Sequence, residues 1–339
     1  MGRLSLLRCL LDNQRMRLDD ERYLYARLPR LRFMLRRALR RPTLDPALYA
    51  DAGIEDGERR HLEAVAASAQ KRFEDRQLLF IYGVMPRSGT NFLYELLLRV
   101  PPFVRSRIAF AEMPILAGES YFRGPTDLIG RVHPPSGAAF GRMEWMSYAV
   151  SGFRNRLLDM ADPASVTLIK TPLVYNIELF PTLFPQDRMI FIVRDARYIV
   201  DSFMRTFART RMSRTFEDVC LETRMAMEKS EAFLAHQPAD RVMPLRYEDV
   251  VRDKGGALRA IFAWMGIEPG AIDGAIEHLP IYGSSTHSRG DGGAVEWKPV
   301  EADGSFDPTS RPLDWSDAHK RIFTRTCGAA NRRQGYPER

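Results

Sequence analysis

The sequence predicts an α/β protein with a central parallel β-sheet flanked by helices. Two observations support this fold class. Short apolar segments typical of buried strands alternate with helical patterns along most of the 339-residue chain, and this alternation is typical of parallel sheets covered on both faces. Charged or polar residues also follow several of these segments, and parallel sheets bind ligands beyond the carboxyl ends of their strands. We therefore expect one large core with a ligand site along one sheet edge.

An arginine-rich segment precedes the alternating region. Residues 1–42 contain twelve Arg and four acidic residues, a net charge of +8, and because the whole chain carries +7 the remainder sums to about −1. Leucines at partly helical spacing predict a helical arm that ends at RPTLDP, residues 41–46. The arm either contacts an anionic membrane surface or a polyanion, or packs on the core with its Arg heads in solvent. We do not expect nucleic-acid binding, because no recognisable module accompanies the charge.

The predicted elements follow in order. A helical stretch at roughly 56–75 completes a basic N-terminal arm, 1–75, and leads into the main domain, 76–339. Strands are predicted at residues 78–84, 104–109, 166–170, 189–193 and 241–246. The stretch 118–165, with one Gly-Pro pair at 124–125 and one Pro-Pro pair at 134–135, interrupts the alternation and predicts an insertion that covers the acceptor. The residues at or just past the predicted strand ends are Arg87, Glu112, Lys170, Arg194 and Tyr247.

The turn after the first strand is the most informative segment. The apolar run 78–84 leads into PRSGTNF, residues 86–92, where a helical pattern opens. Such a turn at a helix start presents free backbone N–H groups and the positive end of the helix dipole, which together bind anions. Five residues separate Gly83 from Gly89, and no Lys precedes Thr90, so the usual nucleotide-triphosphate loop is absent. We expect phosphate-like ligands, but not an ATPase or an ordinary kinase.

A second segment predicts another anion site. The strand at 189–193 runs into Arg194, and a helical pattern places Ser202 eight residues later, a little over two turns. Arg supplies a planar fork of donors for a phosphate, and Ser supplies one hydroxyl donor. The alternative for Arg194 is a salt bridge with Asp195 or Asp201. Two anion sites on neighbouring strands fit a ligand with anionic groups at both ends.

Together, PRSGTNF and IVRDARYIVDSF (residues 192–203) resemble the paired signature of sulfotransferases that use 3′-phosphoadenosine-5′-phosphosulfate (PAPS). The resemblance runs from about Leu78 to the C-terminus. It implies a P-loop-like sulfotransferase fold, closer to the carbohydrate, bacterial and tyrosylprotein types than to the cytosolic type, with PAPS as donor and no metal. The residues that it assigns to the 5′-phosphosulfate are Arg87, Ser88, Gly89, Thr90 and Asn91, and those for the 3′-phosphate are Arg194 and Ser202.

Three further segments extend the implied donor site. Phe92 stands where many relatives stack an aromatic ring on adenine, with core packing as the alternative. PLRYEDVV (244–251) is similar to a family stretch whose Tyr contacts adenine, and SRGDGGAVEWKP (288–299) resembles a mobile loop that closes over the 3′-phosphate. Without the resemblance, the last stretch is a Gly-rich loop. The residues implied by these two stretches are Tyr247, Arg289 and Gly290.

Sulfuryl transfer depends on in-line geometry, charge stabilisation and removal of the acceptor proton. The resemblance implies that Arg87 stabilises the bridging oxygen. Lys170, which closes the strand in LIKTPL, is a candidate for the leaving phosphate or the transferred sulfuryl group; the alternative is a Lys that reaches water. Cytosolic relatives place a catalytic His after the equivalent Lys-Thr, whereas this chain has Pro172, which cannot accept a proton.

Glu112 is therefore the predicted base. It lies in AFAEMP after the second strand, where tyrosylprotein and several bacterial relatives place a catalytic Glu, and a partly desolvated Glu suits this role. A surface Glu that caps a turn is the alternative. Two rival bases are His133 in the insertion and His287 near the Gly-rich loop.

The remaining patterns bear on the acceptor and the compartment. Arg123, Arg131 and Arg142 in the insertion suit an acidic carbohydrate or polysaccharide acceptor, with solvated surface arginines as the alternative. Protein tyrosine or a small alcohol is the alternative acceptor. Three scattered Cys argue against a disulfide framework or a zinc site. No clear signal peptide and no apolar run of the roughly 20 residues needed to span a bilayer are found, so we predict a cytoplasmic protein, with peripheral membrane contact through the arm as the alternative. The rival function is a non-catalytic nucleotide-binding protein.

Overall fold

The computed structural model describes residues 49–107, 142–207, 214–268 and 309–337, with short stretches at 39, 112, 114–118, 132–135, 287–289 and 295–297. The chain divides into two compact units. The sheet unit comprises Tyr49–Arg194 and Lys229–Pro280, and the second unit comprises Met1–Leu48, Asp195–Glu228 and Ile281–Arg339. Apart from residue 39, the predicted segment at 1–42 lies outside the described residues.

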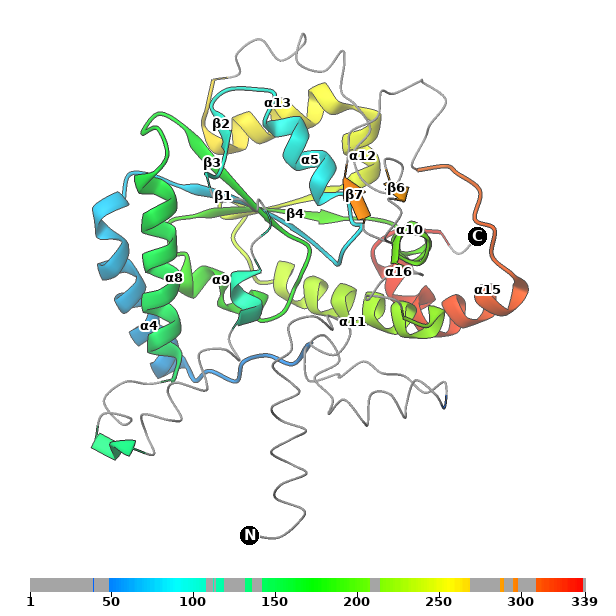
Figure 1. The fold of residues 1–339 in the computed structure, drawn as a ribbon, viewed down its shortest axis with the longest axis horizontal. Helices are drawn as coiled ribbons and strands as arrows, with labels where there is room; N and C mark the ends of the chain where they lie inside the picture. The colour runs from blue at the N-terminus through cyan, green and yellow to red at the C-terminus, as the bar shows by residue number, and fades with distance from the viewer. Residues whose placement is uncertain are drawn as a thin grey trace. The chain divides into compact units, whose positions relative to one another are not determined.

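A five-stranded parallel sheet forms the centre of the sheet unit (Figure 1). Its strand order is β2-β3-β1-β4-β5. In chain order the strands are β1 (Leu78–Gly83), β2 (Phe103–Arg105), β3 (Val166–Thr171), β4 (Arg188–Val193) and β5 (Val242–Arg246). The predicted parallel α/β fold class is confirmed, and each of the five strands lies where the sequence predicted one.

The composition of β1 and β5 agrees with their positions in the sheet. All six residues of β1 are buried, as expected for a strand that has a neighbour on each side and helices on each face. At the edge, β5 contains Pro244, which lies opposite Phe191 of β4. Proline has no backbone N–H to donate to a further strand, so it is tolerated in an edge strand.

Helices cover both faces of this sheet. On one side lie α4 (Asp56–Gln70), α8 (Arg142–Asp159) and α9 (Phe180–Leu183), and on the other lie α5 (Thr90–Leu97) and α13 (Lys254–Met265) (Figure 1). The helix predicted at 56–75 is confirmed as α4 with the short 3₁₀ turn η3 (Lys71–Phe73). The predicted insertion at 118–165 contributes α8, which packs against α4.

The second unit is mainly helical where it is described. Its elements are α10 (Ala196–Phe207), the start of α11 (Phe216–Leu234), β6 (His287–Arg289), β7 (Val295–Trp297), α15 (Asp317–Phe323), the π-helical turn η7 (Thr324–Gly328) and α16 (Ala329–Arg333). Phe216 of α11 packs edge-on against Trp315 with ring centroids 5.1 Å apart. Among the described helices, none is both long and apolar enough to cross a membrane.

Candidate functional site

The loop between β1 and α5 is held in shape by Ser88, whose side chain is fully buried. The Ser88 hydroxyl donates to the Met85 carbonyl at 2.7 Å and accepts from the Met85 N–H at 3.1 Å. A hydroxyl has only one hydrogen to donate, so this side chain closes the turn. A direct contact between Ser88 and the ligand stays a prediction.

Two glycines allow the loop to approach its neighbours closely. A Cβ at Gly83 would lie 2.8 Å from Thr90 Cγ2 and 2.9 Å from Ser88 Cβ. Gly89 has a φ of +104°, and a Cβ there would lie 2.2 Å from Cδ2 of Tyr247. Only glycine combines this backbone conformation with the missing side-chain atom. The glycines therefore let the loop backbone pack against α5 and against the tyrosine ring.

Gly89→Ala is expected to destabilise the protein by at least about 1–2 kcal/mol, because it adds left-handed strain and forces the Tyr247 ring to move. Gly152→Ala is the matched control, since Gly152 lies in α8 with nothing within 4 Å of its added Cβ. That control should be neutral or stabilising by about 0.5–1 kcal/mol. Urea unfolding of both variants measures the difference, and equal midpoints would show that the close approach is unimportant.

The N-terminus of α5 leaves backbone donors for a ligand. The Leu93 N–H donates to the Gly89 carbonyl at 3.2 Å. Within the described part of the chain, the N–H groups from Gly89 to Phe92 have no protein acceptor. Free N–H groups at a helix start attract anions. The loop thus has the donors that the sequence predicted for residues 86–92.

Arg194 connects this loop with Tyr247 at the carboxyl edge of the sheet. Its Nη1 donates to the Arg87 carbonyl at 2.9 Å, and its guanidinium carbon lies 4.2 Å from the centre of the Tyr247 ring. The same ring meets Phe92 edge-on, with centroids 5.7 Å apart. The structure therefore brings together four residues that the sequence assigned to one donor site from three separate motifs.

Arg87 has a strained backbone. Its φ of 86° lies in the left-handed region, which non-glycine residues seldom adopt and which is typical of functional sites. The hydrogen bond from Arg194 to its carbonyl helps to hold this conformation. The loop and the end of β4 therefore form one connected site.

Lys170 and Glu112, assigned separately from the sequence, are direct partners. Lys170 Nζ lies 3.0 Å from Glu112 Oε2, and the two residues also form an isolated parallel bridge. The Lys170 side chain is only 10% exposed, whereas that of Glu112 is 46% exposed. The alternative of a Lys that simply reaches water is therefore wrong. The pair presents a buried ammonium and an accessible carboxylate at the end of β3.

Tyr94 of α5 lies beside this pair, with Lys170 Nζ 6.0 Å from its ring centre. Burial raises the pKa of the Tyr94 hydroxyl to about 12. The hydroxyl thus stays protonated at neutral pH and is unsuited to accept a proton. Tyr94 is therefore not a rival to Glu112, whose role as base stays a prediction.

The other predicted site residues are less well placed by the structure. Ser202 lies on α10 in the second unit and is buried. His287 and Arg289 lie in β6, paired with β7. His133 is exposed in a short described stretch. Their roles stay predictions. The remaining predicted residues, which lie outside the described residues or begin α8 with an undescribed side chain, are Gly290, Arg123, Arg131 and Arg142.

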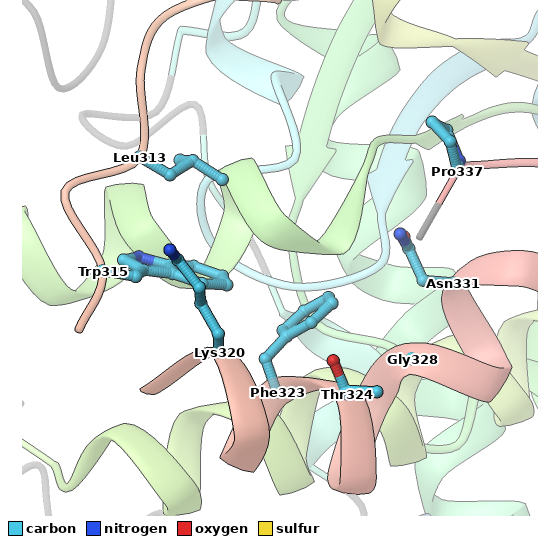
Figure 2. Close-up of a pocket in the computed structure, with 8 residues that line it drawn as sticks. All are labelled: Leu313, Trp315, Lys320, Phe323, Thr324, Gly328, Asn331 and Pro337. Carbon is cyan, nitrogen blue, oxygen red and sulfur yellow. The ribbon is translucent and has the colours of Figure 1, made fainter. Parts of the chain in front are cut away.

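Two further observations concern ligands. Among the described residues, no group of His, Cys, Asp and Glu is arranged to hold a metal ion. A pocket of about 350 Å³ lies in the C-terminal segment (Figure 2). Its lining residues are Leu313, Trp315, Lys320, Phe323, Thr324, Gly328, Asn331 and Pro337. No residue that the sequence assigned to the site lines it.

The chain was compared with known families, curated proteins and solved structures. A family model described as the sulfotransferase family matches residues 79–270. A search of the curated proteins finds no match. Among solved structures, the chain is similar to the sulfotransferase domain of the olefin synthase from Synechococcus PCC 7002, with 20% identity, coverage of 58% of this chain and 75% of that chain, and a TM-score of 0.42.

Two other solved structures show a comparable likeness. A sulfotransferase from Mycobacterium tuberculosis H37Rv has 15% identity, coverage of 95% of this chain and 98% of that chain, and a TM-score of 0.42. A mouse sulfotransferase complexed with PAP has 17% identity, coverage of 62% of this chain and 67% of that chain, and a TM-score of 0.37.

Proposed function

Because the chain belongs to the sulfotransferase family, we propose that it transfers the sulfuryl group of PAPS to a hydroxyl or amine of an acceptor. The observation that carries this proposal is the cluster at the carboxyl edge of the sheet. There the Arg87 carbonyl, the Arg194 guanidinium and the Tyr247 ring are in direct contact. All three residues fall within the segment matched by the family model.

The residues of this edge fit the chemistry of PAPS. The open N–H groups from Gly89 to Phe92 and the side chain of Arg87 suit the 5′-phosphosulfate. The guanidinium of Arg194 suits the 3′-phosphate, together with Ser202, Arg289 and Gly290, which come from the sequence resemblance alone. Phe92, which is half-buried, offers aromatic surface for adenine, and the buried Tyr247 ring packs edge-on against it. When bound, PAPS supplies the sulfuryl group and a phosphate leaving group.

The Glu112–Lys170 pair suits the transfer step. Glu112 Oε2 accepts from Lys170. Oε1 has no donor among the described residues and suits the proton of the acceptor group. The acceptor oxygen or nitrogen forms its bond to sulfur while the bond from sulfur to the bridging oxygen breaks, and the electron pair stays on the donor phosphate. Once Glu112 is neutral, the ammonium of Lys170 has lost its counter-charge and is free to stabilise the leaving oxygen.

Donor binding tests this proposal directly. We expect 3′,5′-ADP, the product of PAPS, to raise the melting temperature, because a ligand at 100 times its Kd stabilises the folded state by about 2.7 kcal/mol. ATP with magnesium should stabilise the protein much less. A preference for ATP would count against a sulfotransferase, and binding of 3′,5′-ADP without transfer from radiolabelled PAPS to any acceptor would favour a non-catalytic binding protein.

Glu112→Gln is expected to lower kcat by at least about 10²-fold, because the amide cannot accept the acceptor proton. The affinity for 3′,5′-ADP should stay within about twofold. Glu95→Gln is the matched control, since Glu95 forms an ion pair with Arg105 at the same 3.0 Å distance on a neighbouring element. Single-turnover assays with radiolabelled PAPS separate the two variants. An unchanged kcat in Glu112→Gln would contradict the role of Glu112 as base and would indicate His133 or His287 instead.

For the acceptor we propose a carbohydrate or polysaccharide. Support comes from the three arginines at 123, 131 and 142, whose cationic side chains suit an already acidic glycan. The basic segment at 1–42 suits the same polyanion or an anionic membrane surface. An acceptor screen that compares acidic glycans, neutral glycans, tyrosine peptides and small alcohols tests this proposal. If replacing the three arginines by neutral residues leaves the turnover of an acidic glycan unchanged, this proposal is contradicted.

A further inference from the structure

The N-terminus of α10 differs from that of α5, because its backbone donors are already used. The Ala196 N–H donates to Asn331 Oδ1 at 2.8 Å, and the Arg197 N–H donates to Asp195 Oδ1 at 2.9 Å. The N–H groups of Tyr198 and Ile199 both donate to the Asp195 carbonyl, at 3.0 and 3.2 Å. All four N–H groups at this helix start thus have protein acceptors. An anion held near α10 therefore depends on side chains, whose positions become decisive.

Asn331 links the start of α10 to a residue far away in the sequence. It lies on α16, is 1% exposed, and donates from Nδ2 to Asp195 Oδ1 at 3.2 Å. Its amide therefore binds both the carboxylate of Asp195 and the first N–H of α10. The positions are 136 and 135 residues apart in the chain. A buried amide that uses both its oxygen and its nitrogen in this way has one orientation only.

Asp195 is equally constrained. Its side chain is 4% exposed and forms an ion pair with Arg197, whose Nε lies 3.0 Å from both carboxylate oxygens. A buried carboxylate with a full set of charge-assisted hydrogen bonds is rigid. Asp195 follows Arg194 directly, and α10 carries Ser202 on its second turn. These two flanking residues are the ones assigned to the 3′-phosphate.

We propose that Asn331 is a positioning residue for Ser202, the hydroxyl that the sequence resemblance assigns to the 3′-phosphate. By holding Asp195 and the first N–H of α10, it fixes the start of the helix that carries Ser202. The inference rests on the proposed function, because it takes Ser202 as a phosphate ligand. It adds a residue from α16 that acts through Asp195 and the start of α10.

The location of Asn331 provides a control. Asn331 and Gly328 lie on consecutive turns beside the C-terminal pocket (Figure 2). An added Cβ at Gly328 would meet only ordinary contacts, of which the nearest is Cγ2 of Thr324 at 3.8 Å. Gly328→Ala therefore alters the pocket and leaves the Asn331 network intact. It separates an effect of the network from a general effect of changing this helix.

The test compares Asn331→Ala, Asn331→Asp, Asp195→Asn and the exchange variant that combines the last two. In Asn331→Asp two carboxylates face each other, whereas in the exchange variant a carboxylate at 331 again accepts from the Ala196 N–H and from an amide at 195. We expect Asn331→Ala and Asn331→Asp to raise the Kd for 3′,5′-ADP and the KM for PAPS by about 10–100-fold, with kcat changed less than threefold, since small misplacements of binding groups have such effects. The exchange variant should recover part of this loss.

A second measurement keeps the inference testable if a variant is unstable. Hydrogen–deuterium exchange of the peptide that covers residues 195–203 should be faster in Asn331→Ala and close to wild type in the exchange variant and in Gly328→Ala. A Kd for 3′,5′-ADP within twofold of wild type in Asn331→Ala, or no recovery in the exchange variant, would overturn the positioning role. Failure of the wild-type protein to bind 3′,5′-ADP would instead overturn the proposed function, and this inference with it.

Discussion

Arg194→Ala is expected to lower kcat/KM for PAPS by about 10³–10⁵-fold. Two charge-assisted hydrogen bonds to a phosphate are worth about 3–6 kcal/mol together, the bond to the Arg87 carbonyl adds about 1 kcal/mol, and every 1.4 kcal/mol corresponds to a tenfold change. Arg194 also packs on Tyr247, so the aromatic surface for adenine loses its support. Titration calorimetry with 3′,5′-ADP measures the loss of affinity, and steady-state kinetics with PAPS measure the loss of kcat/KM.

Arg188→Ala is the matched control for this variant. Arg188 begins the same strand, donates from Nη1 to the Trp264 carbonyl at 2.9 Å, and lies 5.4 Å from the Trp264 ring. It therefore makes the same two kinds of contact at the opposite end of β4. Its loss should lower stability without changing the affinity for 3′,5′-ADP. If Arg194→Ala binds 3′,5′-ADP within threefold of wild type, the 3′-phosphate is bound elsewhere.

Asp187→Ala is expected to lower the free energy of unfolding by about 3–5 kcal/mol, the largest stability effect that we predict. Asp187 Oδ2 accepts from Arg154 Nε at 2.8 Å, and its Oδ1 accepts from the Leu78 N–H at 2.8 Å. Both side chains of the pair are 0% exposed. Removing the carboxylate leaves a guanidinium buried without its counter-charge, and leaves the first N–H of β1 without an acceptor. Urea unfolding measures the loss.

A surface pair and a double substitution provide the comparisons. Asp159 pairs with Arg72 at 2.9 Å, but these side chains are 40% and 71% exposed, so Asp159→Ala should change stability by less than about 1 kcal/mol. Arg154→Met combined with Asp187→Leu should recover much of the loss of the single variant, because a well-packed apolar pair avoids the desolvation of two charges. Similar losses in Asp159→Ala and Asp187→Ala would show that burial does not govern the effect.

The fold was predictable because its evidence is local. Each predicted strand is a short apolar run whose residues are buried by helices on both faces, and β1 is the extreme case with all six residues buried. The strand order was not predictable, because no local pattern states that β1 lies between β3 and β4. Pro244 excludes a central position for β5, which is the one feature of the order that the residues do indicate.

The sequence identified candidate site residues, but not the contacts among them. The turn after β1 and the Arg at the end of β4 are short motifs, and the structure joins them through the bond from Arg194 to the Arg87 carbonyl. The pairing of Glu112 with Lys170 links residues 58 positions apart. Asn331 has no motif of its own, and only its buried hydrogen bonds identify it.

Local patterns were thus enough to identify the fold class, the candidate anion-binding turn and the sulfotransferase resemblance of this chain. Strand burial, helix starts and glycine turns depend on neighbours within a few residues. The connections among Arg194, Arg87 and Tyr247, the ion pair at the end of β3, the buried pair of Arg154 and Asp187, and the network of Asn331 were decided by tertiary structure. Their energies come from desolvation and hydrogen bonding between residues far apart in the chain, and burial of this kind exists only once the chain has folded.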